Sequence, residues 1–128
     1  MSKRGTIILI DHGSRRPEAN ARLDQLAARL LERRPDWSVR CAHLEMAPPG
    51  VPEAIDDCVR DGARDIVLHP FFLLPGRHTR EDLPRLAREA RARHPHVTIQ
   101  ITETLGLDDR LVGIVLDRIE SALSHPSG

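Results

Sequence analysis

The chain has 128 residues, a length that suits one domain with a single hydrophobic core. Nineteen basic and nineteen acidic side chains cancel, so the molecule has no overall field that would gather nucleic acid or an anionic membrane surface. Lys3 is the only lysine, which excludes mechanisms that need a Schiff-base or phosphate-binding lysine in the body of the fold. We expect one domain over residues 1–128, with a frayed tail at 125–128 and no nucleic-acid partner.

The cysteines and the N-terminal segment bear on the compartment. Cys41 and Cys58 form no C-x-x-C pair and need no disulfide, which favours a reducing environment. The N-terminal segment leads directly into an apolar strand, and nothing approaches the roughly 20 apolar residues of a membrane-spanning helix. We therefore expect a cytoplasmic protein without a membrane partner.

The first half of the chain alternates strand and helix patterns. Residues 6–10 are apolar and β-branched, which predicts a buried strand. From Pro17 the apolar residues recur at helical spacing until Pro35, which predicts a helix. The stretch 37–46 predicts a second strand, because the Pro-Pro-Gly segment after it cannot continue a strand. Glu45 then lies at the carboxyl end of that strand.

The second half repeats this alternation. Residues 51–62 predict a short helix, and residues 65–68 predict a third buried strand that runs into a proline. We expect a loop at 71–79 and then a third helix capped by Thr79, with Asp82 three residues further on in an acidic variant of the capping box.

Two further elements complete the predicted architecture. Residues 97–102 alternate between apolar and polar, which is typical of a half-exposed edge strand, and the spacing over 108–123 predicts a last helix. Four strands alternating with four helices predict an α/β three-layer sandwich, in which helices flank a parallel sheet. The two most apolar strands, one and three, belong in its centre, which predicts the order 2-1-3-4. Ligands bind such sheets beyond the carboxyl ends, at the switch point.

Three groups that could bind a metal follow three different strands of this sheet. His12, Glu45 and His78 are far apart in sequence, and the predicted topology brings them to one edge. Two imidazoles and a carboxylate suit a divalent first-row metal. Each residue also has an ordinary interpretation: a turn residue, a surface carboxylate and a solvated loop histidine. Their coincidence at one edge favours a metal site.

Other side chains at this edge suit an anionic, flat ligand. Guanidinium groups can hold carboxylates by paired hydrogen bonds, and four arginines flank the edge: Arg15, Arg16, Arg77 and Arg80. The apolar run 71–74 beside Gly76 would wall a pocket for a macrocycle, although such a run after a strand is more often core. We interpret His43 and His69, which lie inside predicted strands, as hydrogen-bonded core histidines or as supports for the ligands.

Together these motifs are similar to those of a known family. They are Asp11-His12-Gly13-Ser14-Arg15 with Asn20, Leu44-Glu45-Met46-Ala47-Pro48, and the segment from Pro70 to His78 with Asp82-Leu83-Pro84. The chain resembles the small, half-length sirohydrochlorin chelatases of the class II chelatase superfamily, which include the short cobalt chelatases of the cobalamin pathway. The resemblance runs in order from the first strand to the last helix.

This resemblance implies a function and a set of site residues. It implies a chelatase-like half domain that inserts Co²⁺, Fe²⁺ or Ni²⁺ into sirohydrochlorin, with Co²⁺ as the first expectation. The metal is then a substrate, and no cofactor is permanently bound. His12 and His78 match the family histidines that bind the metal and help take the pyrrole protons, and Glu45 matches the acidic position that assists the metal. The expected tetrapyrrole contacts are Ser14, Arg15, Phe72, Leu73, Leu74, Gly76, Arg77 and Arg80.

The resemblance also implies a homodimer, because longer relatives carry two such domains in one chain. A non-catalytic metal or tetrapyrrole carrier of the same fold would show the same ligands and remains an alternative. A phosphoryl-transfer receiver domain fits poorly, since it needs clustered acids after the first strand and a late lysine. A dinucleotide enzyme also fits poorly, because Gly13 is not followed by the G-x-G-x-x-G spacing.

Overall fold

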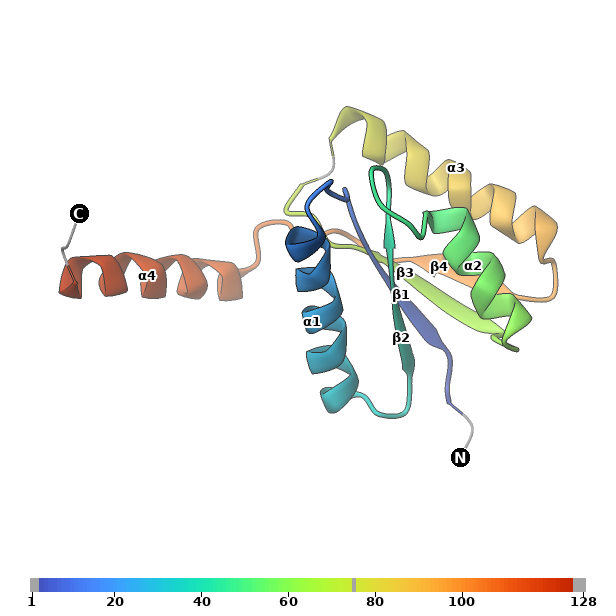
Figure 1. Ribbon diagram of the computed structural model, residues 1–128, viewed down its shortest axis with the longest axis horizontal. Helices are drawn as coiled ribbons and strands as arrows, with labels where there is room; N and C mark the ends of the chain where they lie inside the picture. The colour runs from blue at the N-terminus through green and yellow to red at the C-terminus, as the bar shows by residue number, and fades with distance from the viewer. Residues whose placement is uncertain (1–2, 75, 126–128) are drawn as a thin grey trace.

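The fold is built on a four-stranded parallel sheet. The computed structural model describes residues 3–74 and 76–125, except for the side chains of His78 and Thr79. The strand order is β2-β1-β3-β4 and every neighbouring pair is parallel, which confirms the predicted topology. The strands are β1 (Thr6–Asp11), β2 (Ser38–His43), β3 (Asp65–Pro70) and β4 (Thr98–Ile101) (Figure 1). Most of the tail expected to be frayed, residues 126–128, lies outside the described residues.

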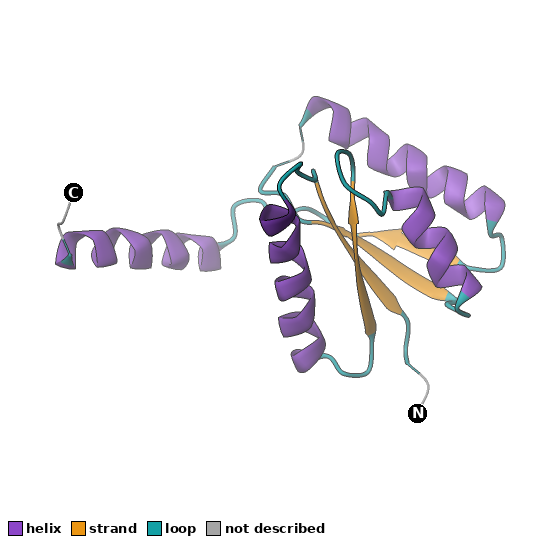
Figure 2. Ribbon diagram, viewed as in Figure 1, coloured by secondary structure: helices purple, strands orange, loops and turns teal. Residues whose placement is uncertain are grey.

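Three of the four helices cover this sheet. The helices are α1 (Pro17–Arg33), α2 (Val51–Arg60), α3 (Arg77–Arg93) and α4 (Asp109–Ser124). Figure 2 shows α1 on one side of the sheet and α2 with α3 on the other, which gives three layers. Within the described residues, no helix is long and apolar enough to cross a membrane.

The core lies between the central strands and helices α2 and α3. Ile8 and Ile10 of β1 and Ile66 and Leu68 of β3 are all but inaccessible to solvent. They pack with apolar residues of the two helices, among them Ile55, Cys58, Ala87 and Ala90. Burying one such large aliphatic side chain stabilises a fold by about 1.5–3 kcal/mol. The most apolar strands therefore occupy the centre of the sheet, as the sequence predicts.

Helix α3 begins earlier than expected. The prediction of a loop to Thr79, with Thr79 as the cap, is wrong, because Gly76 is the N-cap residue and helical backbone starts at Arg77. Gly76 is extended, and its carbonyl accepts the first helical hydrogen bond, from the Arg80 N–H at 3.0 Å. His78 is consequently the second residue of a helix and not part of a loop.

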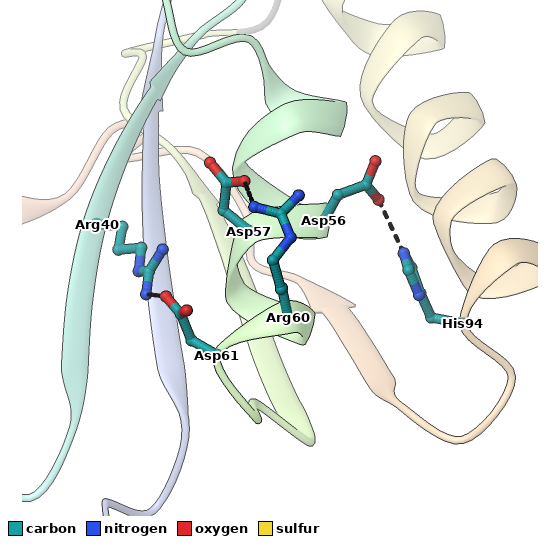
Figure 3. A network of polar contacts seen from close by, with 6 residues as sticks. All are labelled: Arg40, Asp56, Asp57, Arg60, Asp61 and His94. Carbon is teal, nitrogen blue, oxygen red and sulfur yellow. Dashed lines mark hydrogen bonds and ion pairs between the residues drawn. The ribbon is translucent and has the colours of Figure 1, made fainter.

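Polar contacts hold α2 against its neighbours (Figure 3). Arg40 of β2 pairs with Asp61 just after α2, and Arg60 pairs with Asp57 within the helix at 2.8 Å. The imidazole Nε2 of His94, which ends α3, lies 2.8 Å from Oδ1 of Asp56, and this contact lowers the pKa of that carboxyl. The two arginine pairs are exposed to solvent, and such pairs contribute about 0–1 kcal/mol each. The part-buried contact of His94 and the Arg40 pair connect α2 to its neighbours.

Helix α4 covers no part of the sheet. It forms where the apolar spacing predicts, but it contains no buried residue. Figure 1 shows it extending away from the other elements. Most of its large apolar side chains are therefore exposed, and Leu111 in its first turn is half-buried.

Candidate functional site

The first two strand-end loops are joined by main-chain hydrogen bonds. Beyond Asp11 and His43, the last paired residues of β1 and β2, the Leu44 N–H donates to the Asp11 carbonyl at 2.9 Å, and the Glu45 N–H donates to the His12 carbonyl at 3.0 Å. Gly13 permits this approach, since it has a positive φ of 91° and a Cβ there would lie 1.9 Å from the Glu45 carbonyl oxygen. The backbone thus places His12 next to Glu45, although 32 residues separate them in the sequence.

A second set of hydrogen bonds holds the first loop against α1. The Ser14 N–H donates to Oδ1 of Asn20 at 2.9 Å, and Nδ2 of Asn20 donates to the Ser14 carbonyl at 2.8 Å. The Ser14 hydroxyl accepts from the Arg16 N–H at 3.0 Å. Asn20 therefore shapes the loop that carries His12, and the Ser14 hydroxyl supports the same turn.

Two of the other histidines are hydrogen-bonded within the fold, as expected. His43 is buried, with 5% of its surface exposed, and its ring contacts the carboxylate of Asp11. Nδ1 of His69 lies 2.7 Å from the Thr102 hydroxyl, and burial lowers the pKa of His69. The Asp11 carboxylate directly precedes His12, yet sequence reasoning did not identify it as a partner for His43.

An open pocket of about 640 Å³ lies at the carboxyl edge of the sheet. His12 and Glu45 line it from the first two loops, and Gly76 and Arg77 line it from the start of α3. His78 follows Arg77 directly in the chain, but its side chain lies outside the described part of the structure. Among the side chains that are described, no three His, Cys, Asp or Glu residues come together as a ready metal cluster. The pocket unites the first two candidate ligands and reaches the backbone next to the third.

Two acidic residues that sequence reasoning did not propose as site residues also line this pocket. Glu53 lies in the first turn of α2, and Asp82 lies on α3. The sequence offered one clue to Glu53. It stands three residues after Gly50, where a helix begins, and the helix dipole favours an acid in the first turn. A helix start that follows a strand-end loop points its first turn toward the ligand edge of the sheet.

The expected tetrapyrrole contacts are spread around this edge and do not line one wall. Arg80 and Phe72 line a neighbouring cavity of about 570 Å³, together with residues 101–108. Arg15 lines a smaller cavity beside the loop after β2. Leu73 and Leu74 are exposed to 60% and 67%. They form an apolar rim next to Gly76 on the surface.

Phe72 has a different place from its two leucine neighbours. Only 7% of it is exposed, and it belongs to the core cluster. Its ring lies 4.3 Å from the His12 imidazole, centroid to centroid, with a tilt of 33°. Phe72 thus packs against the His12 ring from the core side and restricts its orientation.

Comparison with known proteins identifies relatives of the chain. Residues 6–122 match the CbiX family. The chloroplastic sirohydrochlorin ferrochelatase of Arabidopsis thaliana is 40% identical over 122 residues, which cover 95% of this chain and 54% of the relative. The sirohydrochlorin cobaltochelatase of Methanocaldococcus jannaschii is 31% identical, over 88% of this chain and 95% of the relative.

A solved structure shows the same arrangement of elements. SirB from Bacillus subtilis with Fe³⁺ aligns with a TM-score of 0.81 and 25% identity, covering 94% of this chain and 47% of SirB. The chain therefore spans about half the length of SirB and of the Arabidopsis thaliana relative, and nearly the full length of the archaeal one. With a match that runs from the first strand into the last helix, the chain belongs to the CbiX family.

Proposed function

We propose that this chain is a sirohydrochlorin chelatase. It inserts a divalent metal ion into sirohydrochlorin, and two protons leave the pyrrole nitrogens as the metal enters. The observation that carries the proposal is the pocket where His12 and Glu45 meet the start of α3, in a chain that matches the CbiX family. The metal is a substrate, with Co²⁺ as the first expectation and Fe²⁺ and Ni²⁺ as the others. The product would enter cobalamin or siroheme biosynthesis.

The side chains at this pocket have the chemistry that metal insertion needs. A neutral imidazole such as that of His12 can bind a divalent metal or accept a pyrrole proton near physiological pH. The exposed carboxylate of Glu45 supplies a negative charge beside it, and the two together suit a first-row metal. A site open to solvent lets the metal depart into the macrocycle. We assign His78 the second imidazole role because of the family resemblance and its position next to Arg77.

The surroundings of the pocket suit a flat substrate that carries many carboxylates. Arg77 and Arg85 line the pocket itself, and Arg80 lies one helical turn from the start of α3. Guanidinium groups bind carboxylates through paired hydrogen bonds. The exposed Leu73 and Leu74 offer apolar surface for the plane of the macrocycle. Arginines around an apolar rim thus match the two chemical features of the substrate.

We further propose that the protein acts as a homodimer. The chain matches about half the length of SirB and nearly the full length of the archaeal relative. A second copy would supply the half that the longer relatives carry within one chain. The pocket is open on one side, so a second copy would also help to enclose a macrocycle.

Anaerobic absorbance spectroscopy tests the proposed reaction. Purified protein is mixed with sirohydrochlorin and Co²⁺, Fe²⁺ or Ni²⁺, beside His12→Ala and His78→Ala variants and a reaction without protein. His96→Ala is the matched control, because this histidine is exposed in the turn between α3 and β4. We expect the acceleration to be lost in the first two variants and kept in the control. Wild-type rates equal to the uncatalysed rate would overturn the proposal and leave a metal or tetrapyrrole carrier.

A further inference from the structure

Helix α4 presents an apolar face that the rest of the described chain leaves exposed. Residues spaced three and four apart form a continuous stripe, because such positions share one side of a helix. They are Val112, Val115, Leu116, Ile119 and Leu123, with exposed fractions from 48% to 74%. A contiguous apolar surface of this length marks an interaction site.

The segment before α4 holds the helix away from its own sheet. The Leu105 N–H donates to the Phe72 carbonyl at 2.9 Å, and the Gly106 N–H donates to the Leu73 carbonyl at 2.7 Å. Asp108 then caps the helix by accepting from the Arg110 N–H at 2.9 Å. These bonds anchor the connection beside the β3–α3 loop, and the helix leaves the body from there (Figure 1).

The same chain contains a groove that fits such a helix. An open groove of about 570 Å³ lies between α1 and the residue after β3, Phe71. Its apolar lining is Ala19, Leu23, Leu26 and Phe71, its rim carries Arg22 and Arg29, and its end reaches Asp11 and His12. We name this the α1 groove.

We propose that α4 of one copy lies in the α1 groove of a second copy, and that the second copy returns the same contact. This inference deepens the proposed homodimer and rests on that proposal for the identity of the partner. A reciprocal exchange closes with two-fold symmetry, so both apolar stripes and both grooves are covered at once. Because the α1 groove ends at His12, the partner's helix would form one wall beside the metal site.

Charge and area both fit this occupant. In the proposed contact, Glu120 on one border of the apolar stripe can pair with Arg22 or Arg29 of the groove, while Arg118 lies on the other border of the stripe. A helix of this length is about 24 Å long and about 10 Å wide. Two reciprocal contacts therefore bury about 1,000 Å² in total, which reaches the size of a specific interface.

Sedimentation velocity over a range of protein concentrations tests the helix contact. We expect a dimer for the wild type and for Ser121→Glu, which alters the side of α4 opposite the stripe. Ile119→Glu places a charge in the middle of the stripe and should raise the dimer dissociation constant by about 30-fold or more. Circular dichroism should show an unchanged fold, because Ile119 is 48% exposed on a helix that has no buried residue. A monomeric wild type, or a dimer that Ile119→Glu leaves intact, would overturn the proposal.

Cysteine pairs distinguish a second copy from the chain's own groove. Leu26→Cys and Ile119→Cys, purified separately, are mixed and oxidised. The native thiols should stay inert, since burial raises the pKa of Cys41 to about 12 and also raises that of Cys58. We expect a disulfide-linked pair of chains. A cross-link formed only within one chain that carries both substitutions would show that α4 folds back, and would contradict the exchange.

Metal insertion is measured separately on the same preparations. A wild-type dimer that passes the cross-linking test but inserts no metal would remove the proposed function and leave the exchange standing. A wild-type protein that is monomeric and inserts metal would remove the helix exchange and leave the proposed function standing.

Discussion

Nδ1 of His43 lies 2.5 Å from Oδ1 of Asp11, and this contact joins the carboxyl ends of β1 and β2 below the loops that carry His12 and Glu45. His43 is buried, and its backbone N–H donates to the Pro49 carbonyl at 2.9 Å. The pair therefore forms the base of the candidate site. Neither residue lines the pocket, and neither is an expected metal ligand.

Removing this imidazole should destabilise the fold. His43→Ala leaves a cavity and deprives the Asp11 carboxylate of its partner, so we expect the free energy of unfolding to fall by about 2 kcal/mol. Urea denaturation measures the change. His96→Ala removes an exposed imidazole and should shift the free energy by less than about 0.5 kcal/mol. Equal losses in the two variants would refute a structural role for the pair.

Alanine substitutions at Gly13 and Gly62 distinguish the cost of backbone strain from the cost of steric overlap. Both have positive φ, 91° and 98°, but a Cβ at Gly62 meets nothing within 4 Å. Gly62→Ala should cost about 1–2 kcal/mol for its left-handed backbone alone. Gly13→Ala adds overlap with the Glu45 carbonyl and should cost about 1–3 kcal/mol more. It should also slow metal insertion, because the loops of His12 and Glu45 must separate. Thermal unfolding that gives the two variants equal costs would contradict this geometry.

The carboxylate of Glu45 should matter most when metal is scarce. Glu45→Gln keeps the size of the side chain and removes the charge beside His12. We expect the Co²⁺ concentration for half-maximal insertion rate to rise by about tenfold or more, by analogy with the loss of a group that supports a metal ligand. Glu32→Gln removes an exposed carboxylate near the far end of α1 and is the control. An unchanged metal dependence in Glu45→Gln would exclude a role for this carboxylate.

His69 should give the fold a pH dependence of defined sign. Burial lowers its pKa below the ordinary value of 6.5, so the unfolded chain binds the proton more readily than the folded protein does. Stability should therefore fall as the pH drops below 6.5 toward the folded pKa. His69→Gln removes this contribution and should show a smaller loss between about pH 7.5 and about pH 5.5, measured by urea unfolding. A variant with the full wild-type pH dependence would show that other groups cause it.

Much of the architecture could be predicted from local patterns. The period of the apolar residues distinguishes strands from helices, and the continuous apolar runs at 6–10 and 65–68 identify the central strands. The carboxyl ends of parallel strands share one edge of a sheet, so the sequence alone predicts that His12 and Glu45 lie close together. The main-chain hydrogen bond between them agrees with that reasoning.

Other features depend on contacts that a local pattern does not encode. Thr79 looked like a cap by residue type, but the start of α3 depends on the extended backbone of Gly76 and its bond to Arg80. The arginines at the edge looked like one patch, yet Arg15 and Arg77 line different cavities. Side-chain direction after a loop is set by the loop's path, which long-range packing decides.

Helix α4 marks the division between sequence and tertiary structure most clearly. Its apolar spacing determined that a helix forms and that one of its faces needs a cover. The periodicity does not say which surface supplies that cover. Only the tertiary structure shows that the sheet of the same chain does not cover this face. The hydrogen bonds from Leu105 and Gly106 to the β3–α3 loop direct the helix outward. Local periodicity determines elements and their faces, whereas the pairing of faces depends on where the connections are anchored.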